Sequence, residues 1–199
     1  FETEDMIDTE SYLYAARENF WNGIKSDMGF DASISGYTTT LNCIKNGYPW
    51  KESITSLLGF CDEVCIADAG STDGTWEELQ KWAEEDDRIV IYQNKIDLED
   101  PRFAVKSDGL MKALARSMCT KEFCWQMDAD EIIHEDDYRK VKNLCAQFQN
   151  GLDLLAMPVI EYWGGPEKVR VDINPWKWRI SRNKSNITHG PPAQLRRYD

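Results

Sequence analysis

The chain has 199 residues, of which 42% are hydrophobic and 12% aromatic, a composition that predicts one globular domain and excludes a disordered chain. Its formal net charge of -12 argues against a nucleic-acid-binding protein, because such a protein normally needs a basic face. No apolar run approaches the roughly 18 residues that a membrane span requires.

Strand and helix patterns alternate along most of the chain. In chain order we predict a helix over 8–27, a strand over 38–44, a helix over 50–58, a strand over 63–67, a helix over 75–85, a strand over 88–92, a helix over 107–118, a strand over 123–127, a helix over 136–148, a strand over 154–162, and short strands over 169–171 and 177–180. This βαβ repetition predicts a mostly parallel, doubly wound α/β sheet with helices on both faces. We expect residues 1–35 to form an appended helix and linker, and residues 36–199 to form one domain.

A polar turn follows the predicted strand over 63–67. It runs from Asp68 through Asp73 to Thr75, and Thr75 with Glu78 fits a capping box that starts the next helix. Because open α/β sheets bind ligands at the carboxyl edge of their strands, Asp68 is placed to accept hydrogen bonds from a base or a ribose. The alternative is that Asp68 and Asp73 only fix the turn.

A second acidic motif, Asp128-Ala129-Asp130-Glu131, follows the apolar strand over 123–127. Carboxylate oxygens are the ligands that Mg²⁺ or Mn²⁺ prefers, and such ions usually share their shell with substrate phosphates. The alternative is a solvated acidic turn. An EF-hand is excluded, because Ile132 and Ile133 occupy the fifth and sixth loop positions, where an oxygen ligand and a glycine are needed.

The two motifs, in this order, resemble those of nucleotide-sugar glycosyltransferases of the GT-A fold, a Rossmann-like architecture. The pattern is most similar to inverting family 2, in particular its members that build lipopolysaccharide or surface glycans, and it covers residues 36–190. The resemblance implies transfer of a sugar from a nucleotide-diphosphate donor, with a UDP-sugar favoured, to a glycan or other hydroxyl acceptor, with Mn²⁺ or Mg²⁺. It also implies a nucleotide-binding part over 36–130 and an acceptor side over 131–199.

The resemblance further implies roles for individual residues. The residues implied to lie beside the nucleotide are Ile44, Asn46, Asp68 and Asp128, and those implied to ligate the metal are Asp128, Asp130 and His189. A basic residue upstream of the metal motif is implied to contact the nucleotide or its diphosphate, and the candidates are Arg102, Lys106 and Lys112. Gly47 replaces an acidic residue often found after Asn46. His189 has an ordinary surface role as its alternative, and Glu131 is expected to orient its neighbours.

An inverting transfer needs a base that takes the proton of the acceptor hydroxyl. Glu161, at the end of an apolar run, is the first candidate and Asp172 the second. Aromatic side chains gather in the same stretch, where they either stack on acceptor sugars or join the core. They are Tyr162, Trp163, Trp176 and Trp178.

The remaining features concern charge, cysteines and extent. Basic residues outnumber acidic ones from Pro166 onward, which suits a site that holds a diphosphate. The six cysteines lack zinc-site spacing and are predicted to be reduced core residues. Two other functions stay open: a sugar-nucleotide pyrophosphorylase-like enzyme, and a non-catalytic or incomplete sugar-nucleotide-binding domain of a larger multidomain protein. We expect a cytoplasmic protein that works at a membrane surface through partners.

Overall fold

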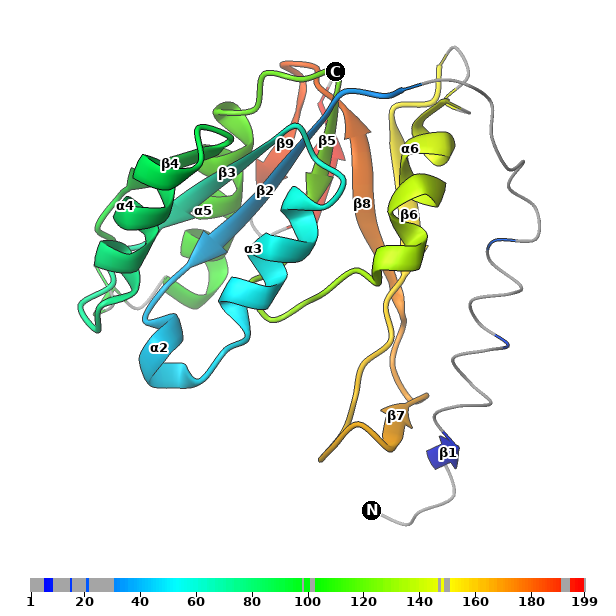
Figure 1. Cartoon of the computed structure of the whole chain (residues 1–199), viewed down its shortest axis with the longest axis horizontal. Coiled ribbons are helices and arrows are strands. Elements are labelled where there is room, and N and C mark those ends of the chain that lie inside the picture. Colours follow the sequence, from blue (N-terminus) through cyan, green and yellow to red (C-terminus); the bar gives the residue numbers. More distant parts are fainter. Residues whose placement is uncertain are drawn as a thin grey trace.

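A computed structural model describes residues 6–8, 15, 21, 31–97, 99–100, 103–146, 148, 151–190 and 194–198, with the backbone alone at 6–8 and 103–106. Its centre is a six-stranded sheet in the order β4-β3-β2-β5-β8-β6 (Figure 1). The strands are β2 (Ile34–Thr40), β3 (Glu63–Asp68), β4 (Ile89–Gln93), β5 (Phe123–Gln126), β6 (Leu154–Pro158) and β8 (Trp176–Arg182). The first four in sheet order are parallel, and β8 runs antiparallel to β5 and β6, so the predicted mostly parallel sheet is confirmed.

Helices cover both faces of this sheet, as predicted. They are α2 (Cys43–Asn46), α3 (Trp50–Leu58), α4 (Thr75–Glu85), α5 (Phe103–Ser117), the 3₁₀ turn η2 (Glu135–Asp137) and α6 (Tyr138–Ala146). The helices α3, α4 and α6 pack over Ile34 and Ile66 on one face, whereas α5 packs over Tyr37 and Cys65 on the other (Figure 1). All six cysteines are free and buried, which confirms their prediction as core residues.

Two small antiparallel ribbons lie outside the main sheet. One pairs β9 (Ile187–Gly190), which packs against α5, with β10 (Gln194–Arg197). The other pairs β1 (Met6–Asp8) with β7 (Lys168–Arg170). Of the helix predicted over 8–27, Ala15 and Trp21 are helical and Asp8 lies in β1, while the rest falls outside the described residues. No helix among the described residues is both long enough and apolar enough to cross a membrane.

The first predicted strand is wrong in its position. The prediction was 38–44, but β2 runs over Ile34–Thr40 and α2 already begins at Cys43. Ser35 and Gly36 at the start of β2 lack the branched side chains that signal a strand. A Cβ at Gly36 would lie 3.1 Å from Sγ of Cys61 and 3.2 Å from Cδ2 of Leu57 in α3, so the helix packs close against the strand at this glycine.

The predicted capping box is also wrong, although the helix start is right. Thr75 is the first residue of α4, and Gly74 is the N-cap, without a side-chain cap hydrogen bond. The Thr75 hydroxyl instead donates to Oδ1 of Asp73 at 2.7 Å. The helix predicted over 136–148 opens as the 3₁₀ turn η2 and becomes α-helical only at Tyr138.

A β-bulge interrupts the pairing of β8 with β6. Leu155 pairs with Ile180 and the next residue, Ala156, pairs with Trp178, so Arg179 is the extra residue of β8. Because a bulge bends the strand and redirects a side chain, the Arg179 side chain leaves the regular alternation of β8.

Candidate functional site

A cleft of about 450 Å³ lies at the carboxyl edge of β2 and β5, a volume typical of small-molecule sites. It is lined by Thr39, Thr40, Leu41, Cys43, Asn46, Tyr48, Ala69, Ile96, Ser107, Asp108, Met111, Lys112, Asp128, Ala129 and Asp130. Four of the residues predicted from the sequence therefore meet in one place: Asn46, Lys112, Asp128 and Asp130. The parallel strands explain this, because their carboxyl ends share one edge of the sheet.

Asp128 is held between a cation and an amide. Its Oδ1 lies 2.8 Å from Nζ of Lys112 and accepts a hydrogen bond of 2.9 Å from Nε2 of Gln126. Lys112 also lies 3.2 Å from Oδ2 of Asp108, one helical turn earlier in α5. Burial acts to raise the pKa of Asp128, but the Lys112 ammonium outweighs it and the pKa is lowered. Asp128 is thus ionised, and no described residue donates a hydrogen bond to its Oδ2.

Asp130 is the exposed partner of the pair. Among the described residues, no hydrogen bond or ion pair engages its carboxylate, which faces the same cleft as Asp128. Two carboxylates with open oxygens, beside one lysine, form a donor set suited to a hard divalent cation and a diphosphate.

Glu131 and Arg179 fix the loop that carries these aspartates. Oε2 of Glu131 accepts a hydrogen bond of 2.9 Å from the backbone N–H of Asp128, which confirms that Glu131 orients its neighbour. Its Oε1 accepts a short hydrogen bond from Nη2 of the buried Arg179. Nη1 of Arg179 donates to Oε1 of Gln126 at 2.6 Å. Burial raises the pKa of Glu131, and the Arg179 guanidinium only partly opposes that rise.

Asp68 lies just beneath the cleft and is fully engaged by the protein. Its carboxylate is buried and accepts five hydrogen bonds, from the backbone N–H groups of Gly70 and Ser71 and the side chains of Thr40, Ser71 and Gln93. Thr40 and Ala69, on either side of it, line the cleft. This geometry favours the alternative interpretation, in which Asp68 fixes the turn, and it also places Asp68 under the floor of the cleft.

The rest of the polar turn ties two loops together. Asp73 accepts a hydrogen bond of 2.7 Å from the backbone N–H of Lys45, and Ser71 Oγ accepts one of 2.8 Å from that of Asn42. Asn42 has a left-handed backbone, with φ of 49°, and its side chain accepts from the N–H of Thr72. The turn after β3 therefore holds the turn after β2, which carries Asn46 into the cleft.

Several predicted nucleotide contacts lie elsewhere or stay undescribed. Ile44 is 46% exposed and is absent from the described lining of the cleft. Arg102 lies outside the described residues, and of Lys106 only the backbone is described. Lys112 is thus the cation that the described part of the cleft presents.

His189 is buried away from the aspartate pair. Its Nε2 lies 2.8 Å from the hydroxyl of Tyr37, under α5. The described residues contain no group of three or more His, Cys, Asp or Glu side chains arranged for a metal ion. Asp128, Asp130 and His189 are thus not brought together here.

The two candidate bases share one guanidinium. Nη1 of Arg170 lies 3.0 Å from Oε1 of Glu161, and Nη2 lies 2.9 Å from Oδ2 of Asp172. Neither carboxylate is among the described residues that line the cleft. The hydrogen bond from Arg170 lowers the pKa of Asp172, which weakens that carboxylate as a proton acceptor.

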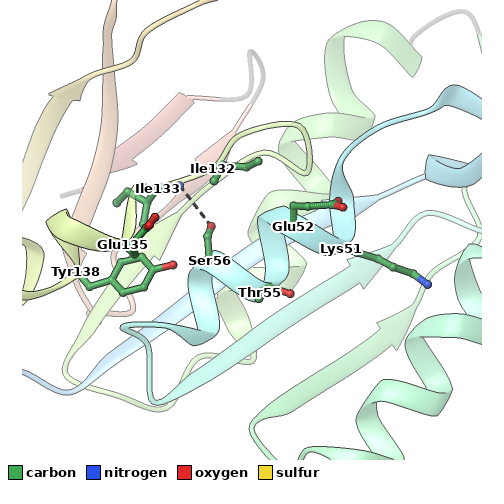
Figure 2. A pocket seen from close by; sticks show the side chains of 8 residues that line it. All are labelled: Lys51, Glu52, Thr55, Ser56, Ile132, Ile133, Glu135 and Tyr138. Carbon is green, nitrogen blue, oxygen red and sulfur yellow. Dashed lines mark hydrogen bonds between the residues drawn. The ribbon is translucent and has the colours of Figure 1, made fainter. Parts of the chain in front are cut away.

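A smaller pocket, of about 280 Å³, lies between α3 and the loop after Asp130 (Figure 2). Its lining is Lys51, Glu52, Thr55, Ser56, Ile132, Ile133, Glu135 and Tyr138. Ser56 Oγ accepts a hydrogen bond of 3.4 Å from the N–H of Ile133, which ties the loop to α3. None of the predicted site residues lines this pocket.

Sequence reasoning missed three residues that hold Lys112, Asp128 and Glu131 in place: Asp108, Gln126 and Arg179. Asp108 and Lys112 are four apart on one helix, a spacing that signals an ion pair. Gln126 and Arg179 left no local signal, because their contact joins residues 53 positions apart.

The model of the family described as Glycosyl transferase family 2 matches residues 50–189. No curated protein sequence matches the chain.

Solved structures of other proteins resemble the fold, among them three of S. aureus TarS. S. aureus TarS 1-349 in complex with UDP has a TM-score of 0.55 at 20% identity, over 76% of this chain and 47% of that one. The same TarS fragment in complex with UDP-GlcNAc has a TM-score of 0.52 at 21% identity, over 67% and 36%. A structure of S. aureus TarS has a TM-score of 0.52 at 18% identity, over 76% and 28%. The chain spans less than half the length of each, and the likeness confirms the GT-A fold.

Proposed function

The chain belongs to glycosyl transferase family 2, and we propose that it is an inverting, metal-dependent glycosyltransferase that uses a nucleotide-diphosphate sugar. Its favoured donor is a UDP-sugar, and its acceptor is a hydroxyl of a glycan or a similar molecule. One observation supports this proposal above the others: Lys112, Asp128 and Asp130 line a single cleft at the carboxyl edge of the sheet. We also propose that residues 36–130 bind the nucleotide and that 131–199 form the acceptor side.

Asp130 and the Oδ2 atom of Asp128 are the groups proposed to hold Mn²⁺ or Mg²⁺. The fit rests on their chemistry, because both are ionisable oxygen donors and no described residue occupies them with a hydrogen bond. When bound, the cation would stabilise the negative charge that grows on the departing nucleoside diphosphate. His189 stays a weaker candidate ligand, since its Nε2 is engaged by Tyr37.

Lys112 is proposed to offset the charge of the diphosphate. Its ammonium is buried against Asp108 and Asp128 and is therefore positioned without the side chain having to be ordered by the ligand. Asn46, on the turn held by Asp73 and Ser71, is proposed to contact the nucleotide from the opposite wall. Asp68 contributes by shaping the floor beneath both.

Glu161 remains the proposed base and Asp172 the second candidate. The Glu161 carboxylate is 45% exposed and has one charged partner, Arg170, whereas Asp172 receives two bonds from that guanidinium. A neighbouring guanidinium lowers the basicity of a carboxylate, and Arg170 makes one side-chain hydrogen bond to Glu161 against two to Asp172. E161Q should lower kcat by at least about 100-fold with donor affinity retained, a loss in the range of general-base catalysis; an unchanged kcat would remove it as the base.

The test of the proposed function is calorimetric titration of UDP, GDP, CMP and dTDP, each with Mn²⁺ and with EDTA. We expect UDP to bind only with Mn²⁺, and D130A to abolish that binding. D87A is the matched control, because Asp87 is an exposed aspartate beyond the cleft. If no nucleotide binds with or without metal, the proposed donor site is wrong.

A turnover assay then separates an enzyme from a binding module. UDP-GlcNAc is the first donor to test, because the TarS fragment that shares the fold was crystallised with it. Release of UDP in the presence of Mn²⁺, lost in D130A, supports transfer chemistry. Binding of the donor without any release of UDP would favour the sugar-nucleotide-binding domain instead.

A further inference from the structure

The segment 159–178, here called the aromatic hairpin, exposes four aromatic side chains. The exposed fractions are 50% for Tyr162, 59% for Trp163, 53% for Trp176 and 47% for Trp178. Single exposed apolar residues are ordinary, whereas exposed apolar side chains that lie side by side mark an interaction site. Trp176 and Trp178 lie two positions apart on the same strand, β8.

The sheet topology places this hairpin at the same edge as the cleft. Because β5 and β6 each run antiparallel to β8, they run parallel to one another. The end of β6 at Pro158 and the start of β8 at Trp176 therefore lie at the edge where β5 delivers Asp128. Arg179, next to Trp178, donates to both Gln126 and Glu131, so Trp178 adjoins the group that holds the aspartate loop.

The register also places the two strand tryptophans on the cleft's face of the sheet. Leu155 and Met157 belong to the core under α3 and α6, so Ala156 lies on the opposite face. Trp178 pairs with Ala156, and Trp176 pairs with Pro158, two residues further on the same side. Over β2 and β3 that face is covered by α5, which supplies Lys112 to the cleft. Two residues of strand separate the indoles by about 6.6 Å along β8.

We propose that Trp176 and Trp178 form a platform that binds a neutral sugar ring of the acceptor, next to the donor cleft. This inference rests on the proposed function and adds the class of acceptor. An indole face buries the C–H groups of a sugar ring and contributes a large apolar contact area. The platform positions the acceptor at the edge where Asp128 and Asp130 lie.

Charge favours a neutral glycan over an anionic membrane surface. The aromatic hairpin carries three acidic residues, Glu161, Glu167 and Asp172, and three basic ones, Lys168, Arg170 and Lys177, so its net charge is zero. Attraction to anionic lipid needs a basic excess, which this segment lacks. Arg170 bridges Glu161 and Asp172, and its guanidinium lies 5.4 Å from the Trp163 ring, so the hairpin beside the platform is braced.

The experiment uses a glycan array of neutral and acidic oligosaccharides, probed with the labelled chain and with three variants. W176A/W178A should lose at least about tenfold in affinity for the neutral glycans that the wild type binds, through loss of the buried indole area. W176F/W178F should recover most of that loss, because it keeps ring faces. Y92A is the control, since Tyr92 is an aromatic of similar exposure, 52%, on the opposite edge strand β4.

UDP titration with Mn²⁺ on the same variants separates this inference from the proposed function. Unchanged UDP affinity in W176A/W178A, with glycan binding lost, supports the platform. Glycan binding equal to wild type in that variant, or no neutral glycan bound at all, overturns it. So does binding to vesicles of phosphatidylcholine and phosphatidylglycerol that disappears in W176A/W178A, since the surface then serves a membrane. Failure of UDP to bind the wild type would instead overturn the donor site alone.

Discussion

Replacing Arg179 by Met should destabilise the protein by about 3 kcal/mol, because it leaves the Glu131 carboxylate buried without its guanidinium. Met keeps an unbranched apolar stem, so the change removes charge and hydrogen bonds more than packing. Breaking a buried ion pair from one side costs about 3–5 kcal/mol. We take the lower end, because 21% of the Glu131 side chain is exposed to water, against 5% for Arg179.

The assay is urea unfolding with linear extrapolation, on R179M, E131Q and the double variant. The double variant should recover at least half of the loss, because removing both charges leaves no orphaned ion. K81M is the control: Lys81 is 67% exposed and 3.5 Å from Glu78, a surface pair worth less than about 1 kcal/mol. If the loss of stability in the double variant equals the sum of the losses in R179M and E131Q, the proposed coupling of Arg179 with Glu131 is refuted.

The stability of the R179M variant should depend on pH. The pKa of Glu131 is already raised by burial, and loss of Arg179 removes the charge that opposes the rise. A carboxyl whose folded pKa lies above its unfolded pKa gives stability at low pH and loses it as pH rises through that window. R179M should therefore lose less stability at pH 5 than at pH 7.5. A larger loss at pH 5 would contradict this account.

Three further predictions concern Lys112 in the cleft, Asp68 beneath it, and the six buried thiols. K112M should raise the pKa of Asp128 and weaken Mn²⁺-dependent UDP binding, measured by titration, by at least about tenfold, since a charge-assisted contact is worth about 1.5 kcal/mol or more. An unchanged UDP affinity would exclude Lys112 from the diphosphate site. D68N should lower the free energy of unfolding in urea by about 2 kcal/mol, because an amide cannot accept all five hydrogen bonds, while the UDP affinity stays within about twofold. Unchanged stability with a weakened UDP affinity would instead favour a contact between Asp68 and the nucleotide base. Ellman's reagent at pH 8 should label none of the six thiols in the native protein and all six in urea, because all six are buried from the reagent and burial raises the pKa of Cys43 to about 11. Rapid labelling of the native protein would show an open core.

Local chemistry determined the elements on which the cleft is built. The bounds of α3 and α4 were predicted to the residue, because a proline before Trp50 and the Asp-Gly-Thr turn before Trp76 are signals that act over a few positions. The two acidic motifs were readable for the same reason, since each follows an apolar strand directly. Their convergence followed from the parallel order of the strands.

Only the tertiary structure decided how those carboxylates are used. Asp68 is saturated by five donors, two of which come from β2 and β4, and Glu131 depends on Arg179, 48 positions away. His189 lies against Tyr37, 152 positions earlier in the chain. From the sequence, the polar loop that carries His189 was interpreted as part of a metal site. Hydrophobic periodicity and turn residues report on neighbours in the chain, whereas these contacts depend on which strands pair and on one bulge in β8. Such long-range pairing is set by the packing of the whole domain, and no short stretch of sequence contains it.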